Sequence, residues 1–200
     1  MKTLLVFIIH LFLAFSASAQ KQEKLKVGQI ALDFIAIDSN NDTIRLSGLR
    51  GKNVYLTLYR NVGCAVCNLR FHEIEMSKDT FLKANTVVIG IYESSQAKLQ
   101  EYTDGERFFS KLIANPDFSI YESYGDELSG SRAFKSLFHG VLRKGKKGSK
   151  LFKKKIKQDG NMNRIGAEFI IDENGIVLLA HYHRFVGDHL TIETIFQKLN

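Results

Sequence analysis

The order of apolar and polar residues divides the first half of the chain into short strands and a longer helix. Two short runs, Asp33 to Asp38 and Thr43 to Leu46, flank the polar stretch Ser39 to Asp42, a pattern typical of a β-hairpin. Val54 to Tyr59 and Thr86 to Ile91 are rich in apolar and β-branched residues, which indicates strands that are buried on both faces. The sequence therefore predicts a hairpin followed by two central strands.

The segment between these two central strands carries apolar residues at helical spacing. Cys67, Phe71, Ile74 and Phe81 follow one another at intervals of three, four or seven residues, which predicts an amphipathic helix. Cys67 is then expected on the stripe that faces the core, whereas Cys64 is expected in the exposed first turn. Strand, helix and strand in this order predict a βαβ unit.

The second half of the chain continues the alternation of helical and extended segments. The expected elements are a crossover helix over 94–102, a short strand at 112–113, short helical segments over 118–124 and 134–141, a hairpin of strands 167–171 and 176–182, and a final helix over 190–199 capped by Asp188 or Thr191. This order predicts one α/β domain, a three-layer α/β/α sandwich with a central mixed sheet and an N-terminal β-hairpin.

The N-terminus has the pattern of a secretory signal peptide. Lys2 precedes the apolar stretch Leu4 to Phe15, and Ala17-Ser18-Ala19 provides small residues for cleavage. We therefore expect a signal peptide over 1–19 and a mature domain over 20–200 that is exported, periplasmic or secreted. The apolar stretch is shorter than the roughly 20 residues of a membrane-spanning helix, so an uncleaved anchor is the less favoured alternative. No transmembrane segment is predicted in the mature chain.

The formal net charge of +7 comes from one segment of the chain. Arg132 to Lys157 contains eleven Lys and Arg residues and no Asp or Glu, while the rest of the mature chain is mildly acidic. The centre of this segment, at about 143–157, combines lysines with glycines and predicts a mobile, solvated basic loop. Such a loop suits an anionic surface, an acidic partner or nucleic acid. Nucleic acid is the least favoured of these partners, because the basic residues are confined to this segment.

The only two cysteines, Cys64 and Cys67, follow the strand that ends at Tyr59 in the order Cys-x-x-Cys. A thiol at the start of a helix meets unpaired N–H groups and the positive end of the helix dipole, which favour the thiolate. Arg60 adds a positive charge four residues before Cys64. As a structural disulfide, so small a ring would stabilise the fold by only about 2 kcal/mol. The pattern therefore predicts a redox-active pair, with a structural disulfide as the alternative.

Histidines offer a site of a different class. Two sets of side chains have donor types that zinc binds in proteins, namely Cys64, Cys67 and His72, and His181, His183 and His189. A closed structural zinc site usually has a second pair of cysteines or histidines at ligand spacing, and the sequence has no other cysteine. We therefore expect neither a metal nor another cofactor. The remaining polar candidates are expected in turns or helix caps, and they are Asp33, Asp172 and Asp188.

Several further pieces of the chain carry a resemblance to a known family. These pieces are the opening hairpin, Tyr59-Arg60 before Gly63-Cys64-Ala65-Val66-Cys67, Asn115-Pro116-Asp117 leading to Tyr124-Gly125, the strand Phe169 to Asp172, and the ending from Ala180-His181 to Gly187-Asp188-His189. Together they resemble the thioredoxin fold and, within it, the redoxins of the alkyl hydroperoxide reductase and thiol-specific antioxidant type, which include peroxiredoxin-like proteins with Cys-x-x-Cys. The resemblance implies that Cys64 is the nucleophile and that Cys67 is the resolving thiol. It also implies a peroxide or a protein disulfide as substrate and a thiol reductant of unknown identity.

Three positions depart from the patterns of these families. A typical peroxiredoxin has a proline and a threonine or serine where this chain has Thr57 and Asn61, so the amide of Asn61 would have to replace the hydroxyl. Peroxiredoxins also have an arginine that stabilises the transition state, and its position corresponds to Gly166 here. Arg164 lies two residues earlier and is on the same face of the strand if the strand begins early enough. Gly166 also stands where thioredoxins place a cis-proline.

Three functional interpretations follow for the candidate residues Cys64, Cys67, Arg60, Arg164 and Asn61. They are a peroxiredoxin-like peroxidase, a thioredoxin-like thiol-disulfide oxidoreductase without peroxidase activity, and a non-catalytic binding domain with a structural disulfide. Attack on a peroxide gives a sulfenic acid and attack on a disulfide gives a mixed disulfide, and Cys67 converts either one to the same final disulfide. Burial of Cys64 would count against both enzymatic interpretations.

Overall fold

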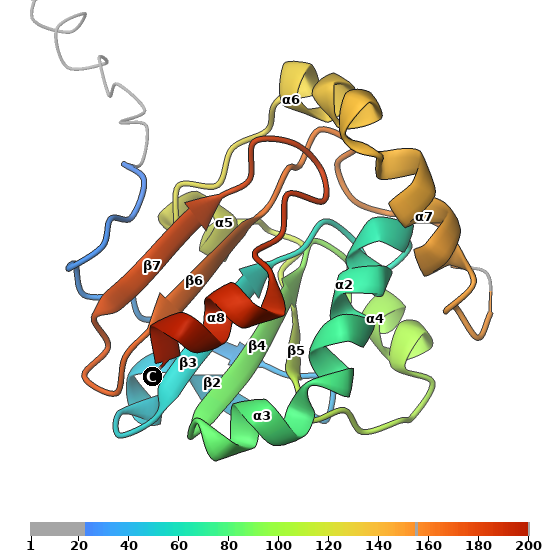
Figure 1. Ribbon diagram of the computed structural model, residues 1–200. Helices are drawn as coiled ribbons and strands as arrows, with labels where there is room; N and C mark the ends of the chain where they lie inside the picture. The colour runs from blue at the N-terminus through green and yellow to red at the C-terminus, as the bar shows by residue number, and fades with distance from the viewer. Residues whose placement is uncertain (1–22, 155, 200) are drawn as a thin grey trace, which may run out of the picture.

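The computed structural model describes residues 23–154 and 156–199. Within these residues, five strands form one mixed sheet in the order β5-β4-β3-β6-β7 (Figure 1). The pairs β3/β4 and β4/β5 are parallel, whereas β6 runs antiparallel to both β3 and β7. Strands β1 and β2 form the predicted N-terminal hairpin. The strands are β1 (Ile35–Ile37), β2 (Thr43–Arg45), β3 (Asn53–Leu58), β4 (Thr86–Tyr92), β5 (Lys111–Ala114), β6 (Ala167–Ile171) and β7 (Val177–Tyr182).

Helices cover both faces of this sheet, as the predicted three-layer sandwich requires. Helices α2, α3, α4 and α8 pack on one face, and α5 packs on the other together with η1 and the hairpin (Figure 1). The helices are η1 (Leu46–Leu49), α2 (Ala65–Met76), α3 (Lys78–Lys83), α4 (Gln96–Thr103), α5 (Ser119–Ser123), α6 (Gly130–Lys135), η2 (Ser136–His139), α7 (Val141–Ser149) and α8 (Ile192–Leu199).

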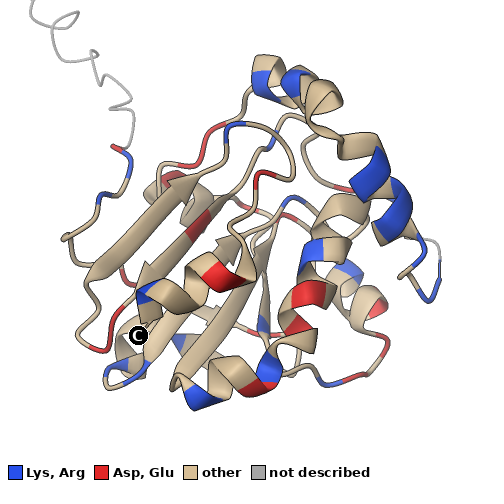
Figure 2. Cartoon of the chain, in the orientation of Figure 1, with Lys and Arg blue, Asp and Glu red and all other residues tan. Residues whose placement is uncertain are grey.

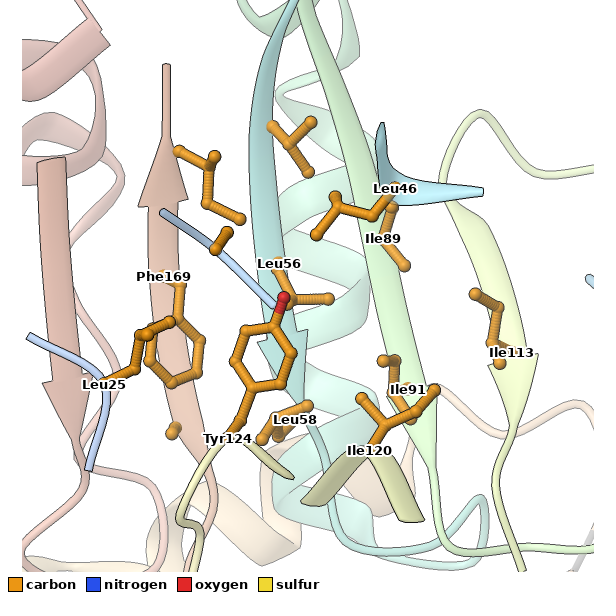
Figure 3. Close-up of a cluster of buried hydrophobic side chains, with 14 of the residues drawn as sticks. Leu25, Leu46, Leu56, Leu58, Ile89, Ile91, Ile113, Ile120, Tyr124 and Phe169 are labelled. Carbon is orange, nitrogen blue, oxygen red and sulfur yellow. The ribbon is translucent and has the colours of Figure 1, made fainter. Parts of the chain in front are cut away.

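Alternate residues of strand β3 point to opposite faces of the sheet. Leu56 and Leu58 join a buried cluster with Ile89 on the face covered by α5 and the N-terminal segment (Figure 3). Tyr55 points the other way and packs against Phe81 beneath α2, α3 and α8. Because both faces are buried, the strand needs apolar side chains at nearly every position, which explains its sequence pattern.

The first half of the basic region at about 143–157 is a helix and not the loop that its composition predicts, whereas residues 150–154 and 156–157 belong to no helix or strand. Val141–Ser149 form helix α7, which packs against α2. Gly148 permits a close approach, since a Cβ at this position would stand 1.7 Å from the carbonyl oxygen of Ala65. The Nδ2 group of Asn68 also donates a hydrogen bond to the carbonyl of Gly148 at 3.0 Å. The loop prediction was wrong for residues 143–149 because α7 docks on α2 at Gly148, through a backbone contact that composition does not show.

Two other expectations need correction or refinement. The predicted helix over 134–141 is divided between α6, η2 and α7, because Gly140 takes a left-handed conformation with φ of 73°. Of the two candidate caps for α8, Thr191 accepts the N–H of Thr194 at 3.0 Å. Asp188 instead accepts the N–H of Arg184 at 2.9 Å in the preceding turn. Asp172 caps the turn between β6 and β7 as predicted, since it accepts two N–H groups of that turn.

The chain has no helix within residues 23–154 and 156–199 that is both long and apolar enough to cross a lipid bilayer. The predicted signal peptide over 1–19 lies outside the described residues.

A buried ion pair connects α2 to the sheet. The Nε atom of Arg70 lies 3.3 Å from Oε1 of Glu168 in β6, and both side chains are buried. Arg70 also donates a hydrogen bond to the hydroxyl of Tyr55 at 3.0 Å. Burial alone would raise the pKa of Glu168, but Arg70, the nearby ring of His183 and a hydrogen bond from His189 hold it well below its usual value. The carboxylate therefore stays charged and depends on Arg70 for its main counter-charge.

We expect Arg70→Met to lower the free energy of unfolding by about 3–5 kcal/mol, because it leaves the charge of Glu168 buried without its partner. Urea denaturation followed by circular dichroism measures this loss. As a matched control, Arg45→Met removes an exposed ion pair with Asp33 and should cost less than about 1 kcal/mol. Equal losses in the two variants would contradict the role given to Arg70.

Candidate active site

Strand β3 carries the chain to the cysteine pair. The strand ends at Leu58, and a short loop leads to Cys64, which directly precedes α2. The Cys64 sulfur accepts a hydrogen bond from the backbone N–H of Cys67 at 3.4 Å, so it occupies the place of an N-cap side chain. The predicted placement at a helix start is therefore confirmed, and the N–H groups there favour a thiolate.

The two thiols have different acidities. Their sulfur atoms lie 2.7 Å apart, with Cys67 donating a hydrogen bond to Cys64. This hydrogen bond, together with the charge of Arg60 and nearby backbone N–H groups, lowers the pKa of Cys64 to about 7, while burial acts in the opposite direction. Arg60 is close enough for this effect, with Nη1 at 3.9 Å from the Cys64 sulfur. Burial raises the pKa of Cys67, so this residue remains a protonated donor beside a thiolate.

Cys64 is buried, which corrects the exposed first turn that helix periodicity predicts. Its exposed fraction is 2%, and that of Cys67 is 4%. Residues 141–154 and 156–160, which we call the cover segment, lie over α2 and the cysteine loop, and Ile156 of this segment belongs to the same buried cluster as both cysteines. Helix α7 of this segment packs on α2, and its backbone at Lys157 and Gln158 lies against Gly63. Periodicity describes a single helix, so it could not show that residues 80 positions further along the chain fold over that helix.

Asn61 has an unsatisfied side chain next to the cysteines. The residue is fully buried, and neither Oδ1 nor Nδ2 has a hydrogen-bond partner among the described residues. Its carbonyl accepts the N–H of Cys64 at 3.0 Å, which fixes the backbone beside the thiol. The cover segment approaches Asn61 at Gly160, where a Cβ would stand 2.9 Å from the Cβ of Asn61. Buried polar groups are rarely unpaired, so this amide can satisfy its hydrogen bonds with a small polar molecule.

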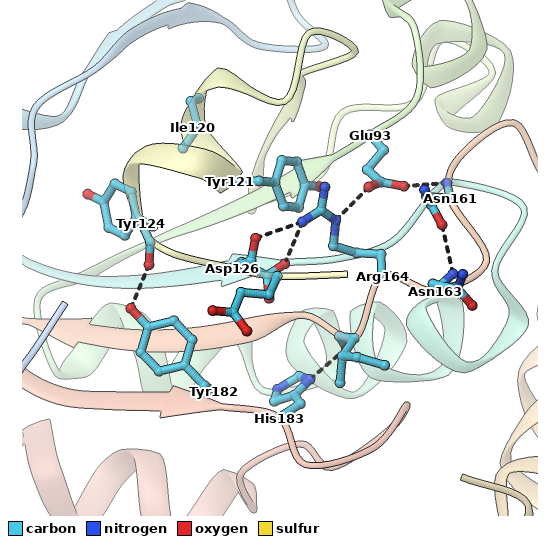
Figure 4. A network of polar contacts seen from close by, with 12 residues as sticks. Glu93, Ile120, Tyr121, Tyr124, Asp126, Asn161, Asn163, Arg164, Tyr182 and His183 are labelled. Carbon is cyan, nitrogen blue, oxygen red and sulfur yellow. Dashed lines mark hydrogen bonds and ion pairs between the residues drawn. The ribbon is translucent and has the colours of Figure 1, made fainter. Parts of the chain in front are cut away.

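Arg164 belongs to a separate buried network (Figure 4). Its Nε donates to Oε1 of Glu93 at 2.6 Å, and Nη1 donates to the carbonyl of Asp126 at 2.8 Å. The guanidinium also lies over the ring of Tyr121, 4.6 Å from its centroid. The contacts recorded for Arg164 within the described residues do not include Cys64. Of the two predicted arginines, Arg60 is therefore the one that reaches the sulfur.

Sequence patterns do not select Glu93 and Ser94, which directly follow β4. Ser94 accepts the N–H of Val62 at 3.0 Å and donates to Asp159 of the cover segment at 2.6 Å. The hydroxyl therefore connects the cysteine loop to its cover. The predicted βαβ unit could have identified both residues. It makes β3 and β4 parallel neighbours, and the residues that follow parallel neighbouring strands meet at the same edge of the sheet.

Gly166 occupies a position that neither arginine nor proline can take. Its φ is +97°, whereas proline requires φ near −65°. A Cβ at this position would stand 2.6 Å from the carbonyl oxygen of Leu58. The close approach of β6 to the end of β3 therefore explains the departure from both family patterns.

The described residues bring one group of possible metal ligands together, and its members are Glu168, His183 and His189. One donor atom of each lies within 4.8 Å of the others. The guanidinium of Arg70 contacts the same carboxylate and would repel a cation. Neither His72 nor His181, both candidates from the sequence, belongs to such a group in the described part of the chain. We therefore assign the cluster to the buried charge network of the fold.

Comparison with known proteins places this geometry in context. The profile of the AhpC/TSA family matches residues 27–180. A Helicobacter pylori protein provisionally named peroxiredoxin bcp is 29% identical over 109 residues, which are 53% of this chain and 72% of that protein. The sequence similarity to these peroxiredoxins is therefore distant, whereas the stretch that matches the family includes both cysteines.

Solved structures share the fold. Peroxidoxin BcpB from Mycobacterium tuberculosis has a TM-score of 0.60 and 18% identity, over 88% of this chain and 96% of that one. A Chlorobium tepidum protein, described provisionally as the thiol:disulfide interchange protein DsbE, has a TM-score of 0.61 and 17% identity, over 88% of this chain and all (100%) of that one. The similarity to these two structures shows the thioredoxin-like redoxin fold. The names of the two proteins state different activities, so the fold alone does not select one of them.

Proposed function

This chain belongs to the AhpC/TSA family, and from that premise we propose that it is a thiol-dependent peroxidase that reduces small peroxides. The observation that carries the proposal is the thiol of Cys64, which has a pKa of about 7 and an exposed fraction of 2%. A thiolate is the reactive form of cysteine. Its burial, the result that counts against both enzymatic interpretations, confines the proposal to a substrate small enough to enter beneath the cover segment.

The proposed reaction begins with attack of the Cys64 thiolate on one oxygen of a peroxide, ROOH. The S–O bond forms as the O–O bond breaks, and the leaving RO⁻ takes up a proton to give ROH. Sulfur is thereby oxidised to a sulfenic acid. The Cys67 thiol then attacks this sulfur, water leaves, and a disulfide forms; the 2.7 Å separation of the sulfur atoms means that this step needs little backbone movement. An external thiol reductant returns two electrons and two protons and regenerates both thiols.

Arg60 and Asn61 are the residues that we propose to assist the first step. The positive charge of Arg60, with Nη1 at 3.9 Å from the sulfur, stabilises the thiolate and the negative charge that develops on the leaving oxygen. The unpaired amide of Asn61 can hydrogen-bond to the peroxide. It would take the place of the hydroxyl that typical peroxiredoxins have.

Arg60→Met and Asn61→Ala should separate these two roles. The rate of Cys64 oxidation by hydrogen peroxide should rise with pH through about 7, because the thiolate is the nucleophile. Arg60→Met should move this midpoint upward by about 1 pH unit, since it removes the opposite charge.

Asn61→Ala should lower the plateau rate by roughly tenfold and leave the midpoint unchanged. Stopped-flow rates across the pH range measure both effects, and an unmoved midpoint in Arg60→Met would contradict its role.

The second candidate function is thiol-disulfide exchange. The likeness to a thioredoxin-fold interchange protein and the Cys-x-x-Cys spacing favour it. A protein disulfide must place one of its sulfur atoms in line with the Cys64 sulfur. The cover segment would first have to move away, because Cys64 is buried beneath it. This requirement makes a protein disulfide the less favoured substrate.

One experiment distinguishes the three interpretations. The reduced protein is mixed in a stopped-flow instrument with hydrogen peroxide or, separately, with oxidised glutathione, and the remaining thiol is titrated after acid quenching. We expect the peroxide to react at least roughly tenfold faster than the disulfide. The opposite order would replace the peroxidase proposal by the exchange reaction. Slow reaction with both reagents would favour a binding domain with a structural disulfide.

We further propose that the protein is exported, periplasmic or secreted. The support is the signal-peptide pattern over 1–19. N-terminal sequencing of the protein recovered outside the cytoplasm should give Gln20 as the first residue. Recovery of the uncleaved chain from the cytoplasm would contradict this proposal.

A further inference from the structure

Helices α6 and α7 and the 3₁₀ turn η2 between them leave large apolar side chains uncovered. Four of these side chains are between 50% and 76% exposed, and they are Phe134, Leu137, Phe138 and Leu142. We call these four residues the apolar tip. The rings of Phe134 and Phe138 contact each other edge to face, with centroids 5.8 Å apart. Exposed apolar side chains that gather in this way mark an interaction site.

The apolar tip is accompanied by cations that have no counter-charge. Exposed cations of α7 and the residue after it form no ion pair within the described part of the chain, and they are Arg143, Lys146, Lys147 and Lys150. Further along, Lys153 and Lys154 are already paired with Glu106 and Asp104. Figure 2 shows Lys and Arg, and no Asp or Glu, on α6 and α7. The surface thus combines apolar side chains with available positive charge.

We propose that the apolar tip and these four cations dock on a lipid bilayer that carries anionic headgroups. Aromatic and leucine side chains beside Lys and Arg are the composition of segments that lie in a membrane interface. Lys and Arg side chains close to an anionic leaflet strengthen such binding. An anionic surface is one of the partners predicted from the sequence, and the proposal identifies this surface as a lipid bilayer.

The shape of this region favours a bilayer over an acidic protein. Figure 1 shows α6 and α7 at the periphery of the molecule, beyond the edge of the sheet. A cavity of about 290 Å³ is lined in part by residues that follow α7, and one of about 350 Å³ is lined in part by Lys144 of α7, but neither is lined by any residue of the apolar tip. A protein partner would have to supply a pocket for four protruding side chains, whereas a bilayer deforms around them. Docking in this way would bring the cover segment, and with it the cysteine pair, next to the membrane surface.

The test uses the fact that the chain contains no tryptophan. Phe138→Trp in the full chain places a single fluorescent probe in the apolar tip. Leu82→Trp in α3 is the matched control, because Leu82 is also an exposed apolar residue but lies outside the tip. With vesicles of mixed phosphatidylcholine and phosphatidylglycerol, we expect the emission of the first variant to shift to shorter wavelength and that of the control to stay unchanged. Neither variant should respond to phosphatidylcholine alone.

Charge is tested in the Phe138→Trp background. Lys146→Gln, Lys147→Gln and Lys150→Gln together should weaken partitioning into the mixed vesicles by about fivefold for each charge removed. Lys52→Gln, Lys78→Gln and Lys83→Gln remove the same charge elsewhere and should change partitioning by less than roughly threefold in total.

Four results would overturn the proposal. They are no spectral shift at position 138, an equal shift at position 82, an equally strong response to poly-glutamate, and a shift that grows with protein concentration without vesicles. The third result would indicate an acidic protein as the partner, and the fourth a second copy of this chain.

Discussion

Cys64→Ser is expected to reduce peroxide consumption by the protein to the rate of buffer, a loss on the order of a thousandfold or more. The thiol of Cys64 has a pKa of about 7, so a large fraction is ionised at neutral pH. A serine hydroxyl is not ionised at this pH and has no sulfur that can accept the peroxide oxygen. Consumption of hydrogen peroxide with dithiothreitol as reductant measures the effect.

Cys67→Ser should have a different consequence. The nucleophile remains, so the first oxidation proceeds, but no second thiol can form the internal disulfide. Without added reductant, we expect about one equivalent of peroxide to be consumed per protein and a sulfenic acid that dimedone labels at Cys64. With a disulfide substrate, the same variant should trap a mixed disulfide. Equal retained turnover in the two serine variants would contradict the assignment of separate roles.

Gly148→Ala is expected to open the site. A Cβ at this position would stand 1.7 Å from the carbonyl oxygen of Ala65, so α7 cannot keep its present contact with α2. We expect Cys64 to react with the bulky disulfide reagent DTNB about tenfold faster or more, because the cover segment then opens at a lower cost in free energy. The rate with hydrogen peroxide should change much less, since the proposed function requires that a small peroxide enter beneath the cover segment in the unmodified protein.

Gly145→Ala provides the matched control for this experiment. Gly145 belongs to the same helix, but a Cβ there would have no heavy atom within 4 Å. Its DTNB reactivity should equal that of the unmodified protein, and circular dichroism should show both variants folded. Unchanged reactivity in folded Gly148→Ala would mean that α7 does not control access to Cys64.

Most of the fold could be predicted because the central strands are buried on both faces. The apolar and β-branched composition of Val54 to Tyr59 and Thr86 to Ile91 predicts their burial. In the structure these segments are the parallel neighbours β3 and β4. The position of Cys64 before a helix could be predicted for a similar reason, since it depends only on local spacing. Local patterns were therefore enough for the sheet and for the placement of the thiols.

The surroundings of the thiols could not be predicted in this way. The burial of Cys64 depends on α7, whose contact with α2 is made through Gly148 and leaves no apolar periodicity. The partners of Arg164 are Glu93, directly after β4, and Asp126, after α5, and the period of a strand predicts neither contact. Both failures concern contacts between segments far apart in the chain, which single-element patterns do not describe.

The distance along the chain between Ala65 and Gly148 also bears on the order of folding. Helix α2 with strands β3 and β4 consists of residues close in sequence, and such local contacts form early, whereas the contact with α7 must close a long loop. While the chain is still being synthesised from its N-terminus, the thiols are therefore complete but open. Arg60 is only four residues from Cys64 in the sequence, so its charge is available to the sulfur before α7 docks, and we expect the nascent protein to be more sensitive to oxidants, and less selective among them, than the finished one.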